Sequence, residues 1–179
     1  MIKHLKVLIY LLLTGLLLIA GYKMFFMKVN VSLKLDDLVN FQESKDPVNI
    51  NNYMKQSKEW STLSLPVGSV AGKSYNWARK KLLKGKPYKA MSIDDLLFVP
   101  STDHEPVIMY HTPSEQVYSS IVREATEKMQ LSNEQILNGK AAYNFVSSTT
   151  AVQLGETPNG QFSILVMSRK DYDKGVRFF

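Results

Sequence analysis

The sequence predicts an α+β protein, in which one N-terminal transmembrane helix precedes a small domain of helices packed on an antiparallel sheet. Three observations support this prediction. The stretch Val7–Tyr22 carries no charge. The segment from Val117 to Met129 has the apolar spacing of an amphipathic helix. Two turn signals of the hairpin type, Asn138-Gly139 and Asn159-Gly160, lie beside segments rich in β-branched and aromatic residues.

The N-terminal segment has the length of a single membrane span. Val7–Tyr22 measures about 24 Å as a helix, and an extension to Met27 adds about 7 Å, against a hydrocarbon core of about 30 Å. Lys6 and Lys23 can extend their ammonium groups to the membrane interface. We therefore predict a cytoplasmic tail over residues 1–6 and a transmembrane signal anchor over residues 7–27.

A cleaved secretory signal is the alternative interpretation of the same segment. Cleavage after Gly21 would place Ile19 where a small residue is preferred, and Tyr22 stands where a lipoprotein has its cysteine. Lysines near the two ends of the segment nearly balance, so the positive-inside rule does not decide the orientation. A short tail before a large domain is typical of a signal anchor in the inner (cytoplasmic) membrane, with a periplasmic C-terminal domain.

The exported part divides by composition into a mainly helical, basic subregion (28–100) and an α+β subregion (101–179), with the polar loop Pro100–Pro106 between them. In the first subregion the patterns predict, in order, an alternating strand or lead segment (29–35), a helical turn (36–43), a helix opened by Asp46-Pro47, a strand (61–65), a helix (69–84) and a short helical segment (96–99).

The second subregion has clearer local signals. A strand is predicted at Val107–Tyr110, followed by a helix that runs to about Gln130. In its capping box, Thr112 is the predicted N-cap and Glu115 the residue that reaches back to it. Residues 141–154 are predicted as one bulged strand or two short strands, and residues 161–168 as a strand.

Basic residues are concentrated in one segment of the chain. No acidic residue lies between Glu59 and Asp94. Seven basic residues in that interval are the candidate binding residues: Lys73, Arg79, Lys80, Lys81, Lys84, Lys86 and Lys89. Lysines on a helix usually form a solvated face, and the functional alternative is binding to an acidic protein partner or an anionic lipid surface. Nucleic acid is not an expected partner of an exported domain.

Few patterns indicate an enzyme. The chain has no cysteine, which excludes disulfides, thiolate metal sites and cysteine nucleophiles. Gly68–Ser74 resembles a phosphate-binding loop but has three residues between its glycines, where that loop needs four. We therefore predict no nucleotide and no other cofactor.

One cluster has the residue types of acid–base or metal chemistry. His104, Glu105 and His111 flank the predicted strand at 107–110, and histidine with carboxylate suits Zn²⁺ or Mn²⁺. Their spacing matches no metal motif, so a small metal-assisted hydrolase is the alternative function. The leading prediction is a non-enzymatic, single-pass envelope protein of the assembly-subunit or immunity/inhibitor type. Its exported domain would bind a protein partner or an anionic surface through the basic segment and the edge of its C-terminal hairpin.

Overall fold

The computed structural model describes residues 31–57, 59–65, 68–72, 94–137, 139–158 and 160–176, together with Thr14 and Gly15, which are helical. The whole predicted tail (1–6) and all of the predicted anchor (7–27) except Thr14 and Gly15 lie outside the described residues. Within the described part of the chain, no helix combines the length and the hydropathy needed to cross a membrane.

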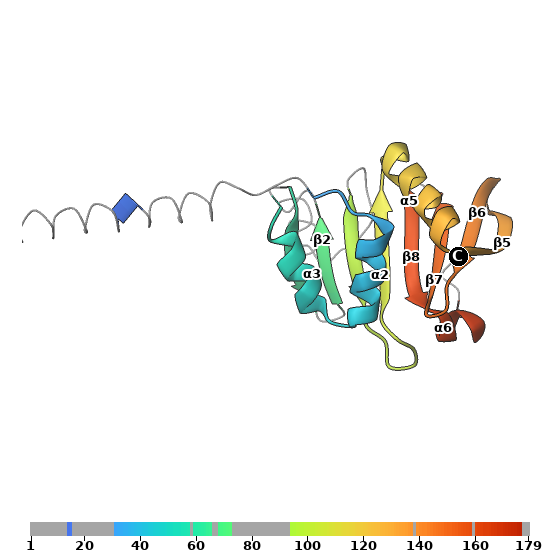
Figure 1. The fold of residues 1–179 in the computed structure, drawn as a ribbon, viewed down its shortest axis with the longest axis horizontal. Helices are drawn as coiled ribbons and strands as arrows, with labels where there is room; N and C mark the ends of the chain where they lie inside the picture. Colours follow the sequence, from blue (N-terminus) through green and yellow to red (C-terminus); the bar gives the residue numbers. More distant parts are fainter. Residues whose placement is uncertain are drawn as a thin grey trace, which may run out of the picture.

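The described part has an α+β fold, as predicted. Its elements in chain order are α2 (Leu35–Ser44), α3 (Pro47–Met54), β1 (Ser61–Leu65), β2 (Gly68–Gly72), β3 (Asp95–Val99), β4 (Val107–Thr112), α5 (Glu115–Lys128), β5 (Gln130–Leu137), β6 (Lys140–Val146), β7 (Thr150–Glu156), β8 (Phe162–Ser168) and α6 (Arg169–Asp173). The described strands form one antiparallel sheet in the order β1-β2-β3-β4-β8-β7-β6-β5 (Figure 1).

The sheet consists of two meanders that meet at its centre. Strands β1 to β4 follow one another along the chain, as do β5 to β8, and the pairing of β4 with β8 joins the two sets. Helix α5 carries the chain from β4, at the centre, to β5, at the edge (Figure 1). Strand β5 therefore has a partner, β6, on one side only among the described strands.

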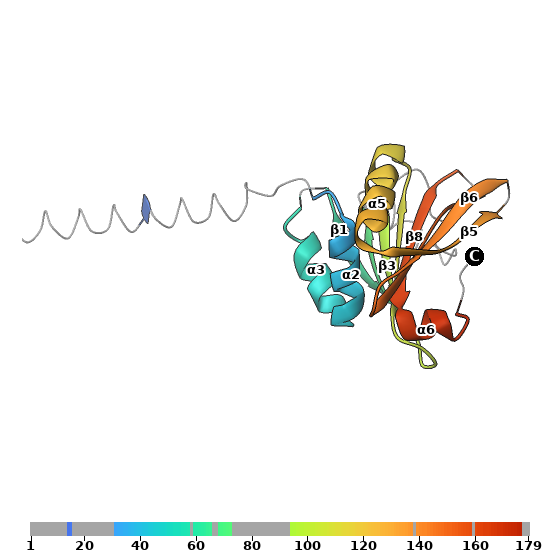
Figure 2. The ribbon, with the colours of Figure 1, turned by 45° about the vertical axis from the view of Figure 1, so that its right-hand side comes forward.

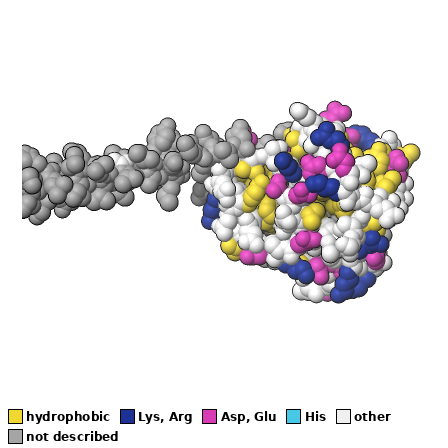
Figure 3. All heavy atoms as spheres, in the orientation of Figure 1, with side chains coloured by type: hydrophobic (Ala, Val, Ile, Leu, Met, Phe, Trp, Pro, Cys, Tyr) yellow, Lys and Arg dark blue, Asp and Glu magenta, His cyan; other side chains and the backbone are white. Residues whose placement is uncertain are grey.

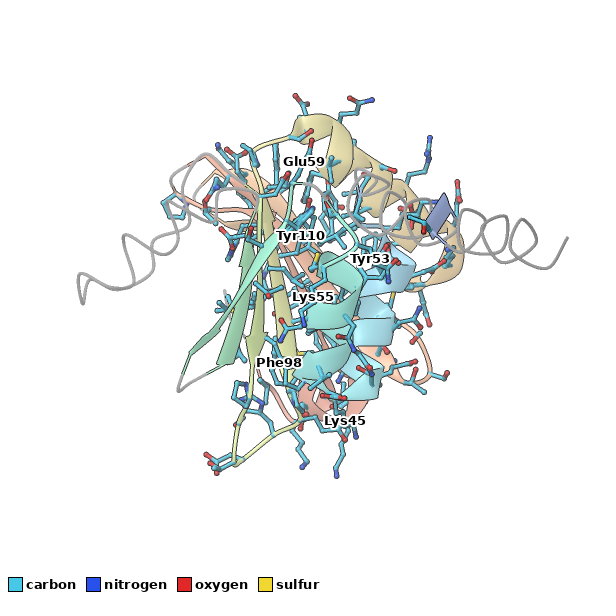
Figure 4. All side chains as sticks on the ribbon, turned by 90° about the vertical axis from the view of Figure 1, so that its left-hand side faces the viewer. Lys45, Tyr53, Lys55, Glu59, Phe98 and Tyr110 are labelled. Atoms are coloured by element: carbon cyan, nitrogen blue, oxygen red, sulfur yellow. The ribbon has the colours of Figure 1, made fainter. Side chains whose placement is uncertain are left out.

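Three helices cover one face of the sheet (Figure 2). Leu38 from α2, Ile50 from α3 and Ile121 from α5 are almost completely buried against it. Tyr110 and Phe98 contribute from the sheet and lie between it and the helices (Figure 4). Burial of side chains of this size contributes about 1.5–3 kcal/mol each. This face therefore holds the larger part of the described core.

The opposite face has a smaller apolar cluster at one end of the central strands. Val107, Leu165 and Met167 are fully buried there, and Tyr172 of α6 packs against them. Helix α6 directly follows β8, and the hydroxyl of Ser168 caps its first turn by accepting a hydrogen bond from the Asp171 amide at 3.2 Å. Helix α6 thus packs at the end of the sheet, on the face opposite the other three helices.

Two predictions about helix starts are wrong. Asp95–Val99 is a strand, not a helical segment, because it pairs with β2 on one side and β4 on the other. The N-cap of α5 is Ser114, whose hydroxyl accepts a hydrogen bond from the Val117 amide at 3.3 Å. Thr112, the predicted cap, is instead the last residue of β4 and bonds the Ser114 amide.

Other predictions about the elements have mixed outcomes. The predicted helix does not begin at residue 69, because Gly68–Gly72 is strand β2 and pairs with β1 and β3; residues 73–84 of that prediction lie outside the described residues. The strand predicted at 61–65 and the hairpin turns are present, with Gly139 and Gly160 at φ of 78° and 79°. Residues 141–154 are divided between β6 and β7. Strands β3 and β4, on the two sides of the polar loop 100–106, are neighbours in one sheet.

Candidate functional site

The predicted basic binding residues all lie outside the described part of the chain. This applies to Lys73, Arg79, Lys80, Lys81, Lys84, Lys86 and Lys89. Their role therefore stays a prediction. The alternative site, by contrast, can be placed in the fold.

His104 and Glu105 do not meet His111. The first two residues lie in the loop before β4, whereas His111 is near the end of that strand. His111 is four residues beyond Val107, which is about 13 Å along an extended strand. Among the residues that the structure describes, no group of three histidine or acidic side chains is arranged to hold a metal.

His111 instead forms a buried pair with Asp95. Its Nδ1 lies 2.8 Å from Oδ1 of Asp95, directly across the β3–β4 ladder. Asp95 is fully buried, and its Oδ2 has no hydrogen-bond partner in the described structure. Ser163 of β8 is opposite His111 on the other side, yet its buried hydroxyl has no partner either. An aspartate that orients a histidine is a device of general bases, and in the described structure His111 makes this bond to Asp95 but none to the Ser163 hydroxyl.

An open hollow of about 660 Å³ lies at the end of the sheet near α6. Its charges are balanced and largely paired. Lys45 Nζ lies 3.1 Å from Glu105, and Arg169 Nε lies 2.8 Å from Asp173. Figure 3 shows the same mixture of basic and acidic side chains on this part of the surface. Among the described residues, three basic and three acidic side chains line the hollow, so its lining favours neither charge sign.

One carboxyl beneath this hollow has a shifted pKa. Asp171 is 3% exposed, and its Oδ2 accepts hydrogen bonds from the Ser168 hydroxyl at 2.7 Å and the Glu105 amide at 2.9 Å. Burial opposes ionisation, but the two hydrogen bonds favour it, and the pKa of Asp171 is lowered from its ordinary value of 3.8. The ionised carboxylate of Asp171 therefore connects the loop before β4 to the start of α6 through hydrogen bonds.

Replacing Asp171 with asparagine is expected to lower the free energy of unfolding by about 1–3 kcal/mol at neutral pH. The native pKa lies below the unfolded one, so this contribution is present above about pH 4 and is lost as the pH falls through the native pKa. Urea denaturation from neutral to acidic pH should show the two curves converging below pH 4. Asp173→Asn, in an exposed ion pair, is the control. A constant difference at all pH values would contradict the assignment.

Strand β5 is the candidate binding site. It is eight residues long and forms an edge of the sheet. An edge strand presents unpaired backbone N–H and C=O groups, which another strand can bind. Edges are usually protected by charged residues, proline, bulges or very short length; β5 has no lysine or proline and is eight residues long, but it contains Glu134 and a register shift between Leu131 and Asn133.

Large apolar side chains are exposed along β5. Ile136 is 77% and Leu131 48% exposed, and Val48 of α3 is the other large hydrophobic residue of the described structure that is exposed. Figure 3 shows hydrophobic side chains at the surface at the end of the molecule where β5 and β6 lie. An unpaired backbone with exposed apolar side chains is suited to binding an extended segment.

Aromatic residues support the sheet beside this edge. Tyr118 of α5 stacks on Phe162 of β8, with ring centroids 4.4 Å apart. Burial, with smaller effects from Tyr143 and Glu156, raises the pKa of Tyr118 to about 12. Tyr143 of β6 packs on the same core and lies opposite Glu134 of β5. Tyr143 therefore packs on the core next to the edge strand, whereas the Tyr118–Phe162 stack lies three strands away, on β8.

The residues of β5 carry little signal of this role in the sequence. Gln130–Leu137 has neither clear alternation nor β-branched content, apart from Ile136, and it was not predicted as a strand. The hairpin signal Asn138-Gly139 was the available clue, since a hairpin needs a strand on each side. The chain matches no protein-family model, no curated protein and no solved structure.

Proposed function

We propose that this chain is a non-enzymatic, single-pass membrane-anchored envelope protein whose exported domain binds a protein partner. The site proposed here is the edge of β5, which would pair with an extended segment of the partner. The observation that carries the proposal is the exposure of Ile136 and Leu131 on an edge strand with no described neighbour. An assembly subunit or an immunity/inhibitor protein would work in this way, by contact.

The position of β5 is compatible with partner binding by a membrane-anchored domain, because β5 lies far from the first residues of that domain. The Trp60 indole N–H donates to the Val31 carbonyl at 3.2 Å, which places the first residues of the described domain beside the start of β1. In the strand order, β1 and β5 are the two opposite edges (Figure 1). Seven strand spacings separate them, on the order of 30 Å along the sheet. An anchor before Val31 would therefore leave the β5 edge free for a partner.

The basic segment is the second proposed contact. Lys73 to Lys89 would contribute through an acidic partner face or anionic lipid headgroups, at about 1 kcal/mol per lysine near such a surface. The β5 edge offers the more specific interaction, because backbone pairing contributes affinity and the alternating side chains of the strand contribute specificity.

Ile136→Lys is expected to weaken partner binding at least about tenfold, because burial of that side chain contributes about 1.5–3 kcal/mol. Val48→Lys is the matched control, since Val48 is an exposed apolar residue on α3. A photo-crosslinking residue at position 136 or 48 of the full chain would first capture the partner in intact cells. Mass spectrometry would then locate its contact segment, and co-purification would measure both lysine variants. Equal capture at both positions, or equal losses in both variants, would contradict the proposal.

A further inference from the structure

The pairing of β5 with β6 determines which β5 side chains lie on the same face of the sheet. The ladder with β6 pairs Leu131 with Phe145, Glu134 with Tyr143 and Ile136 with Ala141. Phe145, Tyr143 and Ala141 alternate along β6, so they share one face of the sheet.

A bulge makes this arrangement possible. The register shifts between Leu131 and Asn133, so Ser132 is the extra residue on β5. Without the shift, Leu131 and Ile136 would point to opposite faces, because they are five positions apart. With it, Leu131, Glu134 and Ile136 lie on one face, in the order apolar, acidic, apolar.

The charge at the centre of this row disfavours a second copy of the chain as the occupant. If two β5 strands paired antiparallel so that Leu131 met Ile136 of the other copy, Glu134 would lie opposite itself. Like charges directly opposite one another destabilise a strand pair. Glu134 is exposed and forms no ion pair with any residue that the structure describes. A basic residue on a different chain would meet it favourably.

We infer that the β5 edge selects an extended segment with the pattern apolar–x–basic–x–apolar, supplied by another protein. This inference rests on the proposed function and specifies its partner. The basic residue pairs with Glu134, and the apolar residues two positions before and after it meet Leu131 and Ile136. The pattern is the same for a parallel or an antiparallel partner strand, because strand side chains alternate in both.

Two fluorescent peptides test the pattern against the full chain in detergent micelles. Both have valine, threonine, a central residue, threonine and valine in their core; one has lysine at the centre and the other glutamate. Fluorescence anisotropy should show the lysine peptide binding about fivefold more tightly, as expected for a cross-strand charge pair. Glu134→Lys should reverse this preference, and Glu134→Gln should remove it. Ile136→Lys should weaken binding of both peptides.

Equal affinities of the two peptides for the natural chain would overturn the pattern, as would no binding of the lysine peptide at about 1 mM. A preference for lysine that persists in Glu134→Gln would overturn it too. Dimerisation of the chain through position 136, detected by crosslinking, would identify a second copy as the occupant and also overturn the inference. The proposed function is tested separately by capture of the natural partner at position 136, which does not depend on the peptide result.

Discussion

Replacing His111 with alanine is expected to lower the free energy of unfolding by about 3–5 kcal/mol, the usual cost of removing one partner from a buried charge. Asp95 is 0% exposed, and among the described residues the His111 ring is the one hydrogen-bond partner of its carboxyl group, at 2.8 Å. The second carboxylate oxygen of Asp95 already lacks a partner. Loss of the imidazole would leave the buried carboxylate without a hydrogen-bond donor among the residues that the structure describes.

Asp95→Ala is expected to cost less, about 1–3 kcal/mol, because the His111 side chain is 11% exposed and that of Asp95 is 0% exposed, so the histidine that remains can reach water. The double variant should be more stable than the sum of the single effects predicts, by about 1 kcal/mol or more, since either change alone already breaks the pair. This non-additivity is the signature of a direct interaction.

Urea denaturation of the full chain in detergent micelles, followed by tryptophan fluorescence, would measure these free energies; Trp60 is buried and therefore a suitable probe. His104→Ala is the control, since its Nδ1 lies 2.8 Å from the Glu105 carbonyl in a partly exposed loop. We expect it to cost less than about 1 kcal/mol. Similar effects of the two histidine variants would contradict a special role for the Asp95–His111 pair.

The elements that were predicted correctly have signals within their own residues. In α5 the apolar residues recur at helical spacing, and Ile121 and Ala125 are buried as that spacing requires. The hairpin turns have glycines at positive φ, a conformation that glycine adopts at little cost. Such local rules can be applied without knowledge of the rest of the chain.

The elements that were missed depend on distant residues. Asp95–Val99 resembles the first turn of a helix, but it is a strand because Asp95 pairs with His111, sixteen positions further on. Gln130–Leu137 contains several good helix formers, and its strand exists through pairing with β6. For the same reason, the face shared by Leu131 and Ile136 could not be predicted, since the bulge that creates it is a property of the ladder. Histidine and carboxylate residues close in sequence were grouped into one site, whereas β4 separates them.

The membrane anchor remains the prediction with the largest expected effect. Placing aspartate at both Leu13 and Leu16, near the middle of the apolar segment, should raise the free energy of insertion by about 5–7 kcal/mol. The chain should then move from the alkali-washed membrane fraction to the supernatant. Isoleucine at the same two positions is the matched control and should stay in the membrane. Intact mass near the 20.4 kDa of the full chain would distinguish a retained anchor from a cleaved signal.

Release of the aspartate variant from the membrane should also affect partner binding at the β5 edge. A strand edge with exposed Ile136 and Leu131 favours weak association with many extended segments when the domain diffuses freely. A tether raises the effective concentration of the edge toward partners in the same membrane and lowers it toward all others. The aspartate variant should therefore lose capture of the partner at position 136, although the edge itself is unchanged. Undiminished capture by the released chain would show that the tether contributes nothing to recognition. Retention of the aspartate variant in washed membranes would contradict the prediction of a membrane anchor.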